Sequence, residues 1–112
     1  MTKLTTEQLD HYNNKGYISP VDALTSIEAK EIRDEIEKIE KNWPKAIEGI
    51  NRNYVHLISP VFNKVCLNKN ILDAVESIIG KNILICGTTL FIKNPKEKGF
   101  VSFHQDAKYI GL

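Results

Sequence analysis

The chain changes character at Gly80, and this change constrains the fold more than any other feature. Residues 71–79 repeat apolar side chains at helical spacing, whereas residues 83–93 are rich in β-branched and aromatic side chains and have no helical period. The second run predicts a long core strand. Gly87 within it indicates a bulge or a close approach by another group. Helices are therefore expected first, and strands follow.

Two helices are predicted with clear start signals. The first runs from about Glu7 to Lys15, where Thr5 and Gln8 have the spacing of a capping box. Gly16 supplies its C-terminal stop. The second helix follows another capping box, and Pro44 blocks its continuation. That box is Thr25 with Glu28, and the buried stripe is Ile32, Ile36 and Ile39.

The stretch between Pro44 and Gly80 carries weaker signals. Residues 54–58 are interpreted as a strand or an extended segment, and residues 61–66 as a short helix. Asn70 is the expected N-cap of a third clear helix, which Gly80 ends.

Two strands are predicted after Gly80, at residues 83–93 and 100–104, with the turn-rich loop 94–99 between them. Two strands with strong apolar faces cannot complete a sheet. We therefore expect residues 1–112 to be a single α+β domain, with helices first and then the opening strands of a larger sheet. On this reasoning the chain is expected to be a fragment.

Composition limits the classes of partner. The chain has 112 residues with 15 basic and 14 acidic side chains, so it carries no large basic field and nucleic acid is not expected as a partner. No apolar run approaches the roughly 20 residues that a membrane helix needs. Cys66 and Cys86 lie far apart and are expected to be buried free thiols. These features together predict a cytoplasmic protein.

His104 and Asp106 form the candidate metal-binding pair. On a strand, residues two apart point to the same face, so an imidazole nitrogen and a carboxylate would aim at one point. These are two of the three ligands in the facial triad that holds non-haem Fe(II). His-x-Asp alone is a weak motif, and ordinary hydrogen bonding at a strand end is the competing interpretation.

Four blocks of the chain resemble the N-terminal half of the phytanoyl-CoA dioxygenase-like family, a branch of the Fe(II)- and 2-oxoglutarate-dependent oxygenases. Phe103 is a mild departure, because the family often has Trp there. The order and spacing of the blocks carry the resemblance. They are residues 9–18, residues 71–80, residues 90–95, and residues 103–106 with Tyr109.

The resemblance implies a double-stranded β-helix, a cupin-like jelly roll, preceded by helices. His104 and Asp106 would be the first two iron ligands, with 2-oxoglutarate and O₂ as co-substrates. The second His and the Arg that pairs with 2-oxoglutarate come later in the family and are absent here. Halogenating relatives have Ala or Gly at the carboxylate position, so Asp106 favours hydroxylation. No catalytic residue is predicted beyond the metal ligands.

Three further residues are candidates for binding the co-substrate, namely Leu90, Lys93 and His56. Each also has a structural interpretation: Leu90 as core, Lys93 as a solvated strand end, and His56 as a satisfied structural histidine. The predicted function is thus part of a dioxygenase that hydroxylates a small molecule or an acyl substrate, inactive as this chain alone. The alternative is a non-catalytic binding or assembly domain, and the sequence leaves the oligomeric state open.

Overall fold

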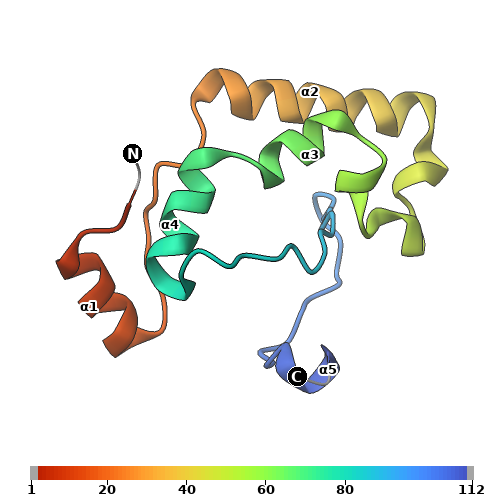
Figure 1. Cartoon of the computed structure of the whole chain (residues 1–112). Coiled ribbons are helices and arrows are strands. Elements are labelled where there is room, and N and C mark those ends of the chain that lie inside the picture. Colours follow the sequence, from red (N-terminus) through yellow and green to blue (C-terminus); the bar gives the residue numbers. More distant parts are fainter. Residues whose placement is uncertain (1–2, 111–112) are drawn as a thin grey trace.

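The computed structural model describes residues 3–110, with side chains as far as Lys108. Five α-helices and three short 3₁₀ segments follow one another along these residues (Figure 1). Their bounds are α1 Thr6–Lys15, α2 Ser26–Asn42, η1 Pro44–Ile47, η2 Gly49–Arg52, η3 Val55–Leu57, α3 Pro60–Cys66, α4 Lys69–Ile79 and α5 Ala107–Ile110.

The first two helices begin and end as predicted. The Thr5 hydroxyl accepts from the Gln8 amide, and the Gln8 side chain accepts from the Thr5 amide, so the capping box is complete. Gly16 closes α1 in the left-handed conformation, at φ 79°. Thr25 and Glu28 form the same kind of capping box before α2. This helix ends at Asn42, two residues before Pro44.

The helices α3 and α4 are also confirmed, with one correction at the start of α4. Asn68, and not Asn70, is the N-cap: its side-chain oxygen accepts from the amides of Asn70 and Ile71 at 2.9 and 3.2 Å. Gly80 ends the helix as expected. Both asparagines suit a cap by residue type, and the backbone path decides between them.

The prediction of a strand or extended segment at residues 54–58 is wrong. This stretch begins with Tyr54 in the left-handed region, at φ 58°, and continues as the 3₁₀ segment η3. The turn lets Val55 point into the core, where it is the most buried of the core side chains at 2% exposure. Burial of Val55 therefore outweighs the extended tendency of the local sequence.

The hydrophobic core lies between α2, α3 and the 3₁₀ segments. Its buried members are Ile39, Ile47, Val55 and Phe62. The partly buried residues packed against them include Ile32 and Ile36 from the predicted apolar stripe of α2, together with Ala46 and Leu90. Leu90 is the member that follows Gly80, so the segment after α4 returns to the core at this point.

The expected α+β class is wrong, because residues 3–110 contain no β-strand. The opening strands of a jelly roll, predicted at residues 83–93 and 100–104, are extended chain in which one isolated antiparallel bridge joins Asn53 and Thr89. A strand needs a partner strand over several residues, and β propensity largely reflects packing against such neighbours. Without them, Leu84, Phe91 and Phe100 are 90%, 76% and 83% exposed.

No helix in the described part of the chain has both the length and the apolar character that a membrane crossing requires.

Candidate metal centre

His104 and Asp106 lie next to each other, although the strand expected to present them is absent. The Nε2 atom of His104 is 3.1 Å from Oδ1 of Asp106. Residues 101–105 have no regular structure, and a turn at Asp106 leads into α5. The turn brings the two side chains together in place of the strand alternation predicted from the sequence.

The contact of Nδ1 orients the His104 ring so that Nε2 faces the Asp106 carboxylate. Nδ1 lies 2.7 Å from the backbone carbonyl oxygen of Ser102. A carbonyl oxygen only accepts hydrogen bonds, so Nδ1 carries the hydrogen. The other nitrogen, Nε2, faces Asp106 and donates its hydrogen to Oδ1 of the carboxylate in the 3.1 Å contact, and a metal ligated through Nε2 would take the place of that hydrogen. Ser102 thus orients His104 through its main chain, and the sequence reasoning did not identify this contact.

The donor set fits a divalent transition metal. Histidine nitrogen and carboxylate oxygen bind such ions at about 2.1 Å, and two ligands at right angles on one ion are then about 3 Å apart. The 3.1 Å between Nε2 and Oδ1 is a hydrogen-bonding contact, and the same separation also suits two neighbouring ligands of one ion. A nitrogen with one carboxylate oxygen is also the partial donor set of a facial triad.

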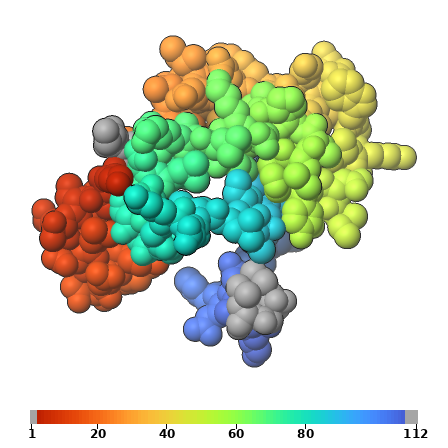
Figure 2. All heavy atoms as spheres, viewed as in Figure 1, coloured from red at the N-terminus to blue at the C-terminus, as the bar shows by residue number. Residues whose placement is uncertain are grey.

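The pair is open and incomplete. The His104 and Asp106 side chains are 36% and 81% exposed, and the segment that carries them lies below the helical body (Figures 1 and 2). Within residues 3–110, no group of three or more His, Cys, Asp or Glu side chains is arranged to hold a metal. The geometry therefore brings together two potential ligands, and both are open to solvent.

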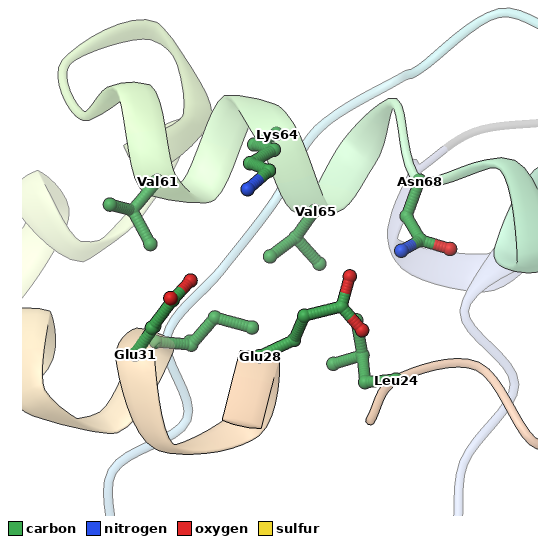
Figure 3. Close-up of a pocket in the computed structure, with 8 residues that line it drawn as sticks. Leu24, Glu28, Glu31, Val61, Lys64, Val65 and Asn68 are labelled. Atoms are coloured by element: carbon green, nitrogen blue, oxygen red, sulfur yellow. The ribbon is translucent and has the colours of Figure 1, made fainter. Parts of the chain in front are cut away.

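A separate cavity of about 90 Å³ lies between α2 and α3. Figure 3 shows Glu28 and Glu31 of α2 facing Lys64 and Val65 of α3 across it. The cavity is lined mainly by side chains of α2 and α3 and includes none of the predicted site residues. Its lining is Leu24, Glu28, Glu31, Ile32, Val61, Lys64, Val65 and Asn68.

Comparison with known families decides what this chain is related to. The family model described as phytanoyl-CoA dioxygenase (PhyH) matches residues 12–111. The chain belongs to the phytanoyl-CoA dioxygenase family. This is a family of Fe(II)- and 2-oxoglutarate-dependent oxygenases. Comparison with curated proteins and with solved structures gave no match.

The three residues proposed to bind the family's co-substrate lie in different surroundings. Leu90 packs against the core cluster, and Lys93 is exposed. His56 is half-buried in η3, with Nδ1 2.7 Å from the Thr88 hydroxyl. None of these contacts involves His104 or Asp106.

Thr88 is the residue near these candidates that the sequence reasoning did not identify. It lies 32 residues from His56, and no local pattern connects the two. The side chain of Tyr109, part of the family-like block, lies outside the described part of the chain.

Proposed function

We propose that His104 and Asp106 are the first two protein ligands of Fe(II) in a 2-oxoglutarate-dependent dioxygenase that hydroxylates a small molecule or an acyl substrate. One observation carries the proposal: Nε2 of His104 faces Oδ1 of Asp106 at 3.1 Å, with Nδ1 held by the Ser102 carbonyl. Membership of the phytanoyl-CoA dioxygenase family supports the assignment of the metal and of the co-substrate.

Each residue has a distinct part in this proposal. His104 would ligate the metal through Nε2, and the Ser102 carbonyl holds the ring with this nitrogen directed toward Asp106. Asp106 supplies negative charge beside it. When bound, Fe(II) with 2-oxoglutarate supplies the oxidising chemistry that O₂ alone lacks at a C–H bond. A carboxylate at position 106 occupies the place that a halide would need, so hydroxylation is the proposed outcome.

A metal titration tests the ligand assignment. We expect the chain to bind Co(II), a spectroscopic substitute for Fe(II), weakly, because two protein ligands hold an ion less firmly than three. His104→Ala and Asp106→Ala are each expected to lower the affinity at least about tenfold. The matched controls are His11→Ala and Asp10→Ala, which remove the same residue types from α1. Equal losses in all four variants would contradict the assignment.

A turnover assay tests the expectation of inactivity. The chain has three histidines, and the other two lie in α1 and η3. Residues 107–112 contain neither His nor Arg, the residue types that supply the third ligand and the 2-oxoglutarate anchor after this motif in the family. We expect no succinate from this chain with Fe(II), 2-oxoglutarate and O₂. Robust succinate production, lost in His104→Ala, would overturn this expectation.

A further inference from the structure

Residues 52–56 contact the extended segment 87–91 through the main chain. The Tyr54 amide donates to the Thr88 carbonyl oxygen at 2.6 Å, and the Leu90 amide donates to the Arg52 carbonyl oxygen at 3.0 Å. These two bonds flank the antiparallel bridge between Asn53 and Thr89. The pattern is that of a non-hydrogen-bonded antiparallel pair, in which opposite side chains lie close together.

Side chains reinforce this pairing. The Thr88 hydroxyl oxygen accepts from the His56 amide at 3.4 Å and lies 2.7 Å from Nδ1 of the same residue. The Thr89 hydroxyl donates to the Asn53 side-chain oxygen at 2.9 Å. Thr88 and Thr89 are consecutive, so their side chains bond to different residues of the turn.

Gly87 completes the contact. A Cβ atom at this position would lie 3.2 Å from Cε1 of Tyr54, tighter than an ordinary contact. Tyr54 is itself held at φ 58°, an uncommon conformation for a bulky residue. The sequence prediction that Gly87 permits a close approach is confirmed, and the approaching group is the Tyr54 ring.

We propose that residues 52–56 are a register clamp for residues 87–91, with His56 and Thr88 as its positioning pair. A one-residue slip of an extended segment moves every side chain to the opposite face. Such a slip would remove Leu90 from the core cluster and bring Thr89 or Phe91 to its place, depending on the direction. The Thr88 hydroxyl prevents it, because only Thr88 meets both the amide and the ring of His56. This inference does not depend on iron binding.

The clamp also determines which side chains face the helices further along the segment. Leu90, Ile92 and Asn94 line a cavity of about 390 Å³ together with Ile47 and residues of the neighbouring 3₁₀ segments. In extended chain the intervening residues point the other way. Phe91, which is 76% exposed with its ring 5.6 Å from the Arg52 guanidinium carbon, is consistent with that alternation.

Hydrogen exchange tests the positioning pair. In Thr88→Val we expect the protection factors of the Tyr54 and Leu90 amides to fall about fivefold or more, because a partly buried hydroxyl contact is lost. Thr88→Ser keeps the hydroxyl and should restore them. Thr89→Val, which loses only an exposed bond to Asn53, is the matched control. Equal effects of Thr88→Val and Thr89→Val, or failure of Thr88→Ser to restore protection, would overturn the proposal.

Cross-linking tests the register itself and remains decisive if Thr88→Val unfolds the chain. The native cysteines are first removed as Cys66→Ser and Cys86→Ser. Cysteines are then introduced as Asn53→Cys and Thr89→Cys. In this type of antiparallel pair the two Cα atoms are about 4.5 Å apart, which is within the range for a disulfide. The introduced pair should oxidise at least about tenfold faster than Asn53→Cys with Thr88→Cys, whose side chains diverge. Equal rates would show that the register is not fixed and would overturn the proposal.

Discussion

At the scale of single residues, burial separates two ion pairs that look identical in the sequence. Lys69–Asp73 and Lys30–Asp34 both join a lysine to an aspartate four residues later. The Asp73 side chain is 7% exposed and Lys69 Nζ lies 2.6 and 2.7 Å from its two oxygens, whereas Asp34 is 56% exposed. An exposed pair of this kind stabilises a helix by only a few tenths of a kcal/mol.

Replacing the two aspartates should therefore have unequal effects. Asp73→Ala is expected to lower the free energy of unfolding by about 1–3 kcal/mol, because it removes a buried, charge-assisted set of hydrogen bonds from α4. Asp34→Ala, the matched control on α2, should cost about 0.3–0.5 kcal/mol. Urea denaturation of both variants measures the difference. Equal losses would mean that burial of Asp73 has no energetic consequence.

At the scale of elements, the start of α2 combines a capping box with a titratable group. The Thr25 amide and hydroxyl both donate to Oε2 of Glu28 at 2.8 Å. The pKa of Glu28 is lowered from its ordinary value, chiefly by the hydrogen bond from the Thr25 amide. The hydrogen bond from the Thr25 hydroxyl lowers it further, and the charge of Lys64 has a smaller effect in the same direction. A carboxyl group with a lowered pKa in the folded state stabilises that state while it is ionised.

This cap should make stability depend on pH in a defined direction. The contribution of Glu28 is fully present above its ordinary pKa and is lost as the pH falls through the lower value that it has in the folded chain. Glu28→Gln keeps an acceptor but cannot ionise, so its stability should vary less between about pH 7 and about pH 3. Urea denaturation across this range measures the slope. Glu31→Gln removes a charge without altering the cap, and an identical slope in both variants would contradict the prediction.

At the scale of the whole molecule, the chain divides into a packed helical part and an exposed extended part. Every side chain from Phe91 to Lys108 is exposed, whereas the core cluster joins α2, α3 and the 3₁₀ segments. Extended segments with few buried contacts fit the active site of a protease better than helices do.

Trypsin should therefore cleave the chain first after Lys93, Lys96 or Lys98. The large product should keep its helical circular dichroism, since the helices that form the core precede these sites. Mass spectrometry of early time points identifies the cut. Lys96→Gln with Lys98→Gln should slow this first step, whereas Lys30→Gln in α2 should not. Early cleavage at Lys30 or Lys64 would show that the helices are no better ordered than the extended segment.

Features that depend on near neighbours could be predicted from the amino-acid pattern. The capping boxes at Thr5 and Thr25 and the stop at Gly80 each involve residues within a few positions of one another. The closeness of His104 and Asp106 was predicted from strand alternation, whereas a turn at Asp106 produces it. Helical hydrogen bonds and caps span three or four residues, so a local pattern contains both partners. The choice of Asn68 over Asn70 is the exception, because either asparagine satisfies the local pattern.

Features whose partners are distant in the chain could not be predicted in this way and depend on the folded arrangement. A strand needs neighbouring strands. In the described part of the chain, the main chain of residues 83–93 pairs with the short turn at residues 52–56 through one isolated bridge, so its high β propensity does not produce a strand. The pairing of His56 with Thr88 and the packing of Leu90 into the core likewise depend on the path of the chain between them. Composition and periodicity describe each segment alone, whereas these contacts depend on which segments the fold brings together.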